Sequence, residues 1–312
     1  MQRHTGVIII THPDFVKHDT GPGHPERPAR IAAIMDMVAR DLPDIPVIDA
    51  QSATDEQITR AHPPAYLMAL EAQVPMRGLV ALDADTTMSP GSMEAARLAA
   101  GAGIQGVDMV LDGRAGAVFC AIRPPGHHAE MLRPMGFCLL SNAYIAARHA
   151  IDAHRCRGCR RVAIVDFDVH HGNGTADLVR RHQKGDVLYA STHQFPFYPG
   201  TGNPAVEGDA GGFILDVPLP AGTGSDVFRA AYTDAILPRL RDFAPDLVIL
   251  SAGFDAHKDD PLGGMRLEAG DFAWVTQEIR AICPRIVSLL EGGYDLAALA
   301  DCARAHIGAL AA

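Results

Sequence analysis

Five residues with metal-binding or acid–base side chains lie within eight positions of one stretch, from Asp166 to Asn173. They follow the apolar run Val162–Val165, which is typical of a parallel strand covered on both faces. In open α/β sheets, ligands bind at the carboxyl ends of strands. Because Asp168 and His170 are two positions apart in an extended segment, their side chains leave the same face and could hold one ion. A carboxylate and an imidazole are ligands that suit zinc.

The simpler interpretation of this stretch is a polar strand end with one capping aspartate, which is common in α/β proteins. Two Asp, two His and two Gly residues within nine positions favour a metal site instead. Polar groups also follow three other expected strands: His127 with His128, Asp255, and Tyr294. Parallel strands bring such ends to one edge of a sheet, so Asp255 can supply a third zinc ligand. Three protein ligands leave coordination open for water and a carbonyl oxygen.

The remaining polar side chains at this edge predict acid–base chemistry around the metal. His127 and His128 can transfer protons near neutral pH. Asp166 and Asn173 could each accept an imidazole N–H and so fix which ring nitrogen carries the proton. The Tyr294 hydroxyl follows a flexible Gly-Gly hinge and could donate a hydrogen bond to an oxyanion. Zinc would acidify the attacking water and polarise the carbonyl group.

Composition excludes several other classes of protein. The chain has 312 residues, 48% hydrophobic and 21% charged, which is enough for a large core. A net charge of −10 argues against non-specific nucleic-acid binding. Apolar runs are too short for a membrane span, and Met1–Ile10 contains only four consecutive large apolar residues, so we expect no signal peptide. Six scattered cysteines fit a reducing compartment, and we expect a cytoplasmic protein.

Strand-like and helix-like segments alternate along the chain, which predicts one parallel sheet covered by helices on both faces. The expected strands are Val7–Thr11, Ala117–Ile122, Val162–Asp166, Val187–Thr192, Phe213–Val217, Leu247–Leu250 and Ile286–Leu290. The main expected helices are Ala29–Arg40, Ser89–Leu111, a helix capped by Ser141 or Asn142 that ends near His154, Thr175–His182, a helix capped by Ser225 that ends near Asp242, and Glu268–Ile282. Without a linker or repeat, we expect a single domain.

Two polar loops have no assigned role from the sequence. The segment His18–Pro28 is dense in Gly, Pro and His, and it fits a functional loop and a rigid surface loop equally well. In the second loop, Leu82–Gly91, Asp83 and Asp85 could line the rim of a site, although a turn or capping role fits them at least as well.

Five motifs together resemble those of the zinc-dependent histone deacetylases. They are Arg123-Pro-Pro-Gly-His-His-Ala129, Gly136-Phe-Cys138, Asp166-Phe-Asp-Val-His-His-Gly-Asn-Gly-Thr175, Ser251-Ala-Gly-Phe-Asp-Ala256 and Glu291-Gly-Gly-Tyr294. The resemblance runs from about His18 to the final helix. Asn173 stands where class I enzymes have Asp, so the chain looks class II-like, as in bacterial histone deacetylase-like amidohydrolases and acetylpolyamine amidohydrolases. The resemblance implies the arginase–deacetylase α/β fold with an eight-stranded parallel sheet, forming a catalytic domain over residues 1–312.

The resemblance also implies a role for individual residues. Asp168, His170 and Asp255 match the zinc ligands, His128 the general base and acid, His127 its electrostatic partner, and Tyr294 the oxyanion donor. The substrate channel would have Phe137 and Tyr198 as walls, Leu262 at the rim, and Gly136 and Gly293 in its lining. The family also binds structural potassium, which here would be held by Asp166, Asp168, His170, Ser191 and Thr192. A second potassium site would use main-chain oxygens near Val179, His182, Gly185 and Phe213.

Two other classes of function remain as alternatives. A binuclear manganese hydrolase of the arginase type needs an Asp two residues after the last ligand, but His257 occupies that position. A non-catalytic module that binds acyl-lysine or polyamine could lose Tyr294 or a catalytic histidine without harm, yet both are present. The sequence therefore favours an amidohydrolase with one metal.

The substrate and the oligomeric state are left open by the sequence. Histones are implied only by the name of the family. Polyamine specialists tend to carry acidic gatekeepers and an inserted dimerisation loop, whereas this chain is short and Leu262 is uncharged. We therefore expect an acylated lysine in a protein or peptide, or a small N-acyl amine, with acetylpolyamine as the alternative. We expect no direct nucleic-acid or membrane partner.

Overall fold

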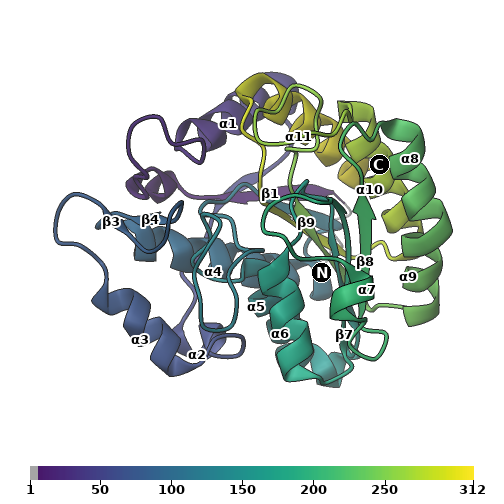
Figure 1. The fold of residues 1–312 in the computed structure, drawn as a ribbon, viewed down its shortest axis with the longest axis horizontal. Helices are drawn as coiled ribbons and strands as arrows, with labels where there is room; N and C mark the ends of the chain where they lie inside the picture. The colour runs from purple at the N-terminus through teal and green to yellow at the C-terminus, as the bar shows by residue number, and fades with distance from the viewer. Residues whose placement is uncertain (1–5) are drawn as a thin grey trace.

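Eight parallel strands form the central sheet of this computed structural model, which describes residues 6–312 (Figure 1). Residues 1–5, part of the segment in which no signal peptide is expected, lie outside the described residues. The strand order is β2-β1-β5-β10-β9-β6-β7-β8. The strands are β1 (Val7–Thr11), β2 (Val47–Asp49), β5 (Ala117–Cys120), β6 (Val162–Asp166), β7 (Val187–Gln194), β8 (Ile214–Leu219), β9 (Leu247–Ala252) and β10 (Ile286–Leu290).

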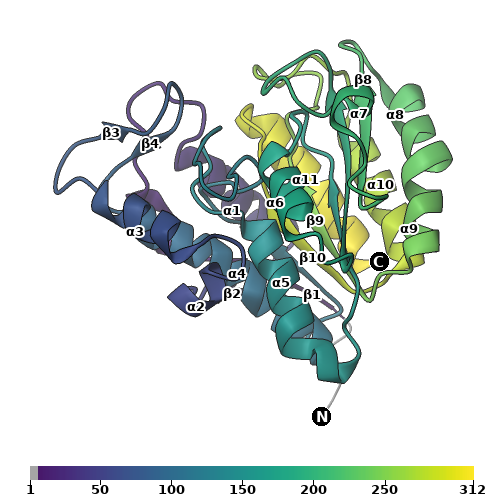
Figure 2. The same ribbon diagram turned by 60° about the horizontal axis from the view of Figure 1, so that its bottom comes forward.

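Helices cover both faces of this sheet (Figures 1 and 2). One layer contains α4 (Ser92–Leu111), α5 (Asn142–His154) and α6 (Asn173–His182). The other contains α1 (Ala29–Asp41), α8 (Ser225–Ala231), α9 (Leu237–Phe243), α10 (Ala269–Ile282) and α11 (Leu296–Ala311). Shorter helices are α2 (Asp55–Ile58), α3 (Pro64–Ala72) and α7 (Pro204–Glu207). None of the helices within residues 6–312 combines the length and the apolarity needed to cross a membrane.

The four central strands position the residues expected to form the site. β5, β10, β9 and β6 are neighbours in the sheet, and every residue in them is buried because helices cover both faces. Their register puts Asp166 beside Ser251 at the carboxyl ends of β6 and β9. The expected parallel sheet with two helical layers is therefore confirmed, and the polar segments after these strands meet at one edge.

The structure corrects the expected elements in a few places. β2 was absent from the expected strands because it has only three residues and lies at the sheet edge, and the two-stranded ladder of β3 (Val80–Ala81) and β4 (Thr87–Met88) was missed as well. Ser141 precedes α5 but makes no capping hydrogen bond with its side chain. Ser225 is the first residue of α8 rather than its cap, and its hydroxyl donates to Asp271.

The helix expected to run from Ser225 to near Asp242 is interrupted by a π-helical turn at Tyr232–Ile236, between α8 and α9. Pro238 follows this turn and has no backbone N–H to donate to the preceding turn of a regular α-helix. A wider turn at this position accommodates the missing hydrogen bond.

Candidate active site

The three expected metal ligands lie together at the carboxyl edge of the sheet. Asp168 and His170 follow β6, and Asp255 follows β9, the neighbouring strand. Nδ1 of His170 is 3.0 Å from Oδ1 of Asp168 and 3.2 Å from Oδ2 of Asp255. All three side chains are buried, with one ligand atom of each within 4.8 Å of the others. A carboxylate–imidazole–carboxylate set of this kind is suited to one zinc ion.

Hydrogen bonds orient these carboxylates and leave one oxygen without a partner. Oδ2 of Asp168 accepts from the backbone N–H of Gly292 at 2.8 Å, and Oδ1 of Asp255 accepts from that of Val169 at 2.8 Å. Oδ2 of Asp255, which faces His170, accepts no hydrogen bond from any residue in 6–312. A buried carboxylate oxygen without a donor is costly unless a cation binds it. The residues present therefore fit a zinc ion.

His127 and His128 follow β5, and their rings have different partners. Nδ1 of His127 lies 3.0 Å from Oδ2 of Asp166, and Nδ1 of His128 lies 2.7 Å from Oδ1 of Asn173. The Asn173 amide N–H₂ donates to Oε1 of Glu130, so the amide oxygen must face His128. His128 therefore donates from Nδ1, and its Nε2 is left as the proton acceptor.

The electrostatic surroundings separate the two histidines further. Burial alone would lower the pKa of His127, but the carboxylates of Asp168 and Asp166 raise it well above its usual value. Burial lowers the pKa of His128 well below the usual value, helped by positive charge on His127 and His170. A metal cation next to His170 would add positive charge at the same place. His127 is consequently the imidazolium of the pair and His128 the neutral imidazole.

The Tyr294 hydroxyl comes from the loop after β10. Burial raises the pKa of Tyr294 well above its usual value, so the hydroxyl keeps its proton and can donate it in a hydrogen bond. The two glycines before Tyr294 are tightly packed. A side chain at Gly292 would collide with Asp255 and Asp168, and Gly293 has φ +118°, a conformation that L-residues rarely adopt.

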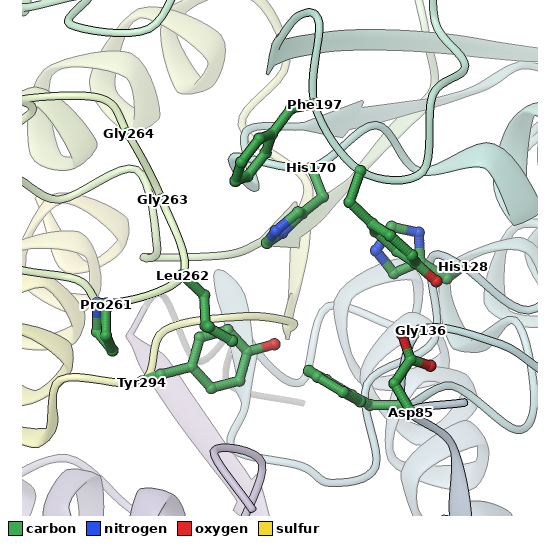
Figure 3. A pocket seen from close by; sticks show the side chains of 12 residues that line it. Asp85, His128, Gly136, His170, Phe197, Pro261, Leu262, Gly263, Gly264 and Tyr294 are labelled. Carbon is green, nitrogen blue, oxygen red and sulfur yellow. The ribbon is translucent and has the colours of Figure 1, made fainter. Parts of the chain in front are cut away.

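A cavity of about 440 Å³ leads down to these groups (Figure 3). Its lining consists of Asp85, His128, Gly136, Phe137, His170, Phe197, Tyr198, Pro261, Leu262, Gly263, Gly264 and Tyr294. Figure 3 shows the rings of His128, His170 and Tyr294 around the same central space. Gly136 has φ +57°, and any side chain there would collide with His128, so glycine keeps the cavity open beside the ring.

The expected channel residues lie in the lining of the cavity, with one exception. Phe137, Tyr198 and Leu262 line the cavity as expected, but Gly293 does not. The Cβ position of Gly293 faces Leu299 instead. Phe197 was missed as a lining residue although it adjoins Tyr198 in sequence. Its ring stacks on His170 with 5.3 Å between centroids, so it helps to hold that ring in place.

Two carboxylates that sequence reasoning left without a role support the catalytic loops. Oε2 of Glu291 accepts from the backbone N–H groups of Gly126 and His127, at 2.7 and 3.1 Å. Burial raises the pKa of Glu291 to about 7. Oδ2 of Asp260 accepts from the backbone N–H of Tyr294 at 2.6 Å. The Glu291 side chain of the Glu-Gly-Gly-Tyr motif thus anchors the loop of the two histidines.

The two polar loops of unassigned role lie beside this site. In the segment His18–Pro28, Glu26 is fully buried and forms a two-pronged ion pair with Arg123 at 2.8 Å for each contact. In the second loop, Asp83 accepts backbone N–H groups in a turn, whereas Asp85 lines the cavity. Only Asp85 of the two aspartates therefore reaches the rim of the cavity.

Comparisons with known proteins agree with this geometry. The histone deacetylase domain family matches residues 24–310. An uncharacterised protein of Synechocystis sp. is 45% identical over 302 residues, which cover 94% of this chain and 96% of that protein. The histone deacetylase-like amidohydrolase of Pseudomonas aeruginosa is 37% identical over 307 residues, covering 94% of this chain and 78% of the relative.

A solved structure shares the whole architecture. The crystal structure of the HDA15 HD domain superposes with a TM-score of 0.91 at 33% sequence identity, covering 98% of this chain and 88% of the other. The expected eight-stranded fold is confirmed by this likeness. The chain therefore belongs to the histone deacetylase family, whose members are zinc-dependent, and it is a hydrolase with deacetylase activity.

Proposed function

We propose that this protein hydrolyses the amide bond of an acylated lysine or a similar short-chain N-acyl amine. The cavity carries this proposal: it has the aromatic side chains of Phe137 and Tyr198 in its lining, together with the acid–base groups His128 and Tyr294. An unbranched alkyl stem fits between aromatic walls and would bring its acyl group to the polar residues. Residues 1–312 would act as one catalytic domain, which the family match over 24–310 supports.

The proposed mechanism assigns one task to each polar group. Asp168, His170 and Asp255 would hold one zinc ion, which supplies charge to acidify water and to polarise the carbonyl group. His128 takes a proton from the attacking water at Nε2, because its Nδ1 already donates to Asn173. His128 then returns the proton to the departing amine. His127, kept charged by Asp168 and Asp166, stabilises the negative charge that develops nearby.

Tyr294 would donate its hydroxyl hydrogen to the oxyanion that forms from the substrate carbonyl. We expect Tyr294→Phe to lower kcat by about 10²–10³, because the variant keeps the ring but loses the donor. Binding of a substrate analogue and the zinc content should stay unchanged. Steady-state kinetics together with metal analysis would check this, and a kcat near that of the wild type would exclude the assigned role.

Asn173→Asp should shift the acidic limb of the pH–rate profile of kcat/KM to higher pH. A carboxylate next to Nδ1 stabilises the imidazolium form and raises the pKa of His128. Since only neutral His128 can accept a proton, the fraction of active enzyme at a given acidic pH falls. Glu130 lies beside position 173, so the double variant with Glu130→Gln, which removes the repulsion between the carboxylates, should show the larger shift. If the acidic limb of both variants lies at the same pH as that of the wild type, the role of His128 is contradicted.

We also propose that structural potassium accompanies the zinc. One site would use Asp166, Asp168, His170, Ser191 and Thr192. The strand register supports this set, because Asp166 at the end of β6 pairs with Ser191 on β7. Near the second set of expected residues, a small cavity is lined by Val179, Gly185 and Phe213, while His182 lies outside that lining.

An acetylated polyamine is the second candidate substrate, and Asp85 is the observation that favours it. The Asp85 carboxylate is in the lining of the cavity, where it could attract the ammonium groups of a polyamine chain. The same carboxylate could accept backbone N–H groups of a peptide. Acetate release from acetyl-lysine peptides, longer acyl-lysine peptides and acetylated polyamines would separate the two. If the protein turns over only acetylated polyamines, and Asp85→Asn loses this turnover, the acetylpolyamine proposal replaces the acyl-lysine proposal.

Family membership argues against the non-catalytic binding module that the sequence left as an alternative. The intact set of His128, Asn173 and Tyr294 around one cavity supports an enzyme instead. Any turnover of an acetyl-lysine reporter that disappears in Tyr294→Phe would exclude the binding module. Tight binding of an acyl-lysine peptide without turnover would support it.

A further inference from the structure

Helices α4 and α5 pack against each other (Figure 2). A second cluster of metal-binding side chains joins these two helices. Asp108 is in the last turn of α4, and His149 and His154 come from the C-terminal half of α5. Because α5 ends shortly before β6 begins, this cluster is near the amino edge of the sheet, opposite to the catalytic site. The proposed hydrolytic mechanism uses none of these three residues.

Both imidazoles converge on one carboxylate oxygen. Nε2 of His149 is 2.8 Å and Nε2 of His154 is 2.7 Å from Oδ1 of Asp108. The two histidine side chains are only 8% and 6% exposed, so packing fixes their rings, whereas Asp108 is 36% exposed. Two fixed imidazoles and one solvent-exposed carboxylate can serve as three ligands of a zinc ion. One water would complete its four-coordination.

We propose that Asp108, His149 and His154 form a peripheral binding site for one zinc ion, separate from the catalytic one. Asp108 also lines a cavity of about 160 Å³ whose lining does not include the two histidines, so solvent reaches the cluster from the carboxylate side. The C-terminal ends of two helices also carry partial negative charge, which favours a cation at this position. A bound ion would join the ends of α4 and α5.

Binding requires two small rearrangements. Metal–ligand bonds of about 2.0–2.2 Å place tetrahedral ligands roughly 3.3 Å apart, so the partly exposed Asp108 must withdraw by about 0.6 Å. Coordination through Nε2 also moves each ring proton to Nδ1. For His154 this breaks no hydrogen bond, since its Nδ1 has no partner among residues 6–312.

For His149, the proton shift creates a competition with Arg60. The guanidinium of Arg60 donates to Nδ1 of His149 at 2.9 Å, and this bond cannot persist once Nδ1 carries a proton. Arg60 can turn towards its second partner, the exposed Glu56, which lies 3.4 Å away. Removing Arg60 should therefore strengthen zinc binding, whereas a purely structural role of the cluster predicts no such gain.

The test counts zinc ions bound to the full chain with its catalytic site already loaded. Zn²⁺ alone is titrated by equilibrium dialysis with elemental analysis, and Tm is followed in parallel. We expect a second bound ion and a rise in Tm for the wild type. Asp108→Asn and His154→Ala should bind that ion more than about 100-fold more weakly, since losing even an outer partner of a ligand costs 10–100-fold. Arg60→Ala should bind it more tightly.

Two controls separate this site from adventitious binding. His12→Ala removes a histidine beside a carboxylate elsewhere in the chain, at 3.8 Å from Asp14, and should behave like the wild type. Mg²⁺ should not raise Tm, because it prefers oxygen ligands in octahedral geometry. All variants should keep the catalytic zinc and the deacetylation rate.

The proposal is overturned if the wild type binds only the catalytic zinc or if Asp108→Asn binds a second ion as tightly as the wild type. Weaker zinc binding in Arg60→Ala would also contradict it. None of these measurements of bound zinc depends on turnover, so a failure of the proposed substrate class would not affect the result.

Discussion

Loss of both zinc and turnover is the expected result of replacing Asp255 by alanine. Asp255 supplies one of the three proposed ligands, and its Oδ2 is a buried oxygen that accepts no hydrogen bond within the described chain. Two protein ligands are too few for a tightly held catalytic zinc ion, which usually has three. Metal analysis and acetate release, measured on the same preparation, should fall together.

A milder variant separates loss of the metal from misfolding. Asp255→Ala also leaves the backbone N–H of Val169 unpaired, which costs about 1–3 kcal/mol of stability. Asp255→Asn keeps an oxygen for that N–H but replaces the anionic ligand by a neutral amide, so it should fold and still lose zinc. Asp259→Ala, four residues further in the same loop and with an exposed side chain, is the matched control. Full zinc occupancy in Asp255→Asn would show that the ligand set is wrong.

His128→Ala should abolish measurable turnover, whereas His127→Ala should leave a remnant. Loss of a general base and acid costs about 10²–10⁴ in rate, and His128 is the histidine with a free, neutral Nε2. In the proposed mechanism His127, whose pKa is raised by the carboxylates of Asp168 and Asp166, acts only through its charge. The two residues are adjacent and both buried, so each variant serves as the control for the other.

Single-turnover rates of both variants, each with its zinc content measured, would check this ranking. Unchanged zinc in both would exclude loss of metal as the cause of a slower rate. If His127→Ala is the slower variant, the roles of the two histidines are reversed. Equal rates in the two variants would mean that they act as one unit.

The central strands could be predicted because their sequences are nearly continuous apolar runs. Val162–Asp166 and Ile286–Leu290 have the same bounds in the structure as expected from the sequence. The polar residues after such strands must share one edge in a parallel sheet, which is why Asp168, His170 and Asp255 could be grouped from the sequence.

Other features depend on contacts between distant segments, and no local pattern reveals them. β2 is a three-residue edge strand whose Val47 is exposed, so it lacks the apolar run of a central strand. The close packing of Gly292 against Asp168 and Asp255 is formed only in the folded chain. The ion pair of Glu26 with Arg123 joins residues that are 97 positions apart.

The most direct test of zinc-dependent amide hydrolysis is acetate release from an acetyl-lysine peptide by protein that has been stripped of metal and then reloaded. The rate should fall to the background when chelation removes zinc, return when Zn²⁺ is added back, and stay at the background with Mg²⁺, which prefers oxygen ligands in octahedral geometry. Metal analysis at each stage ties the rate to zinc occupancy. Undiminished acetate release by protein shown to contain no metal would contradict the account.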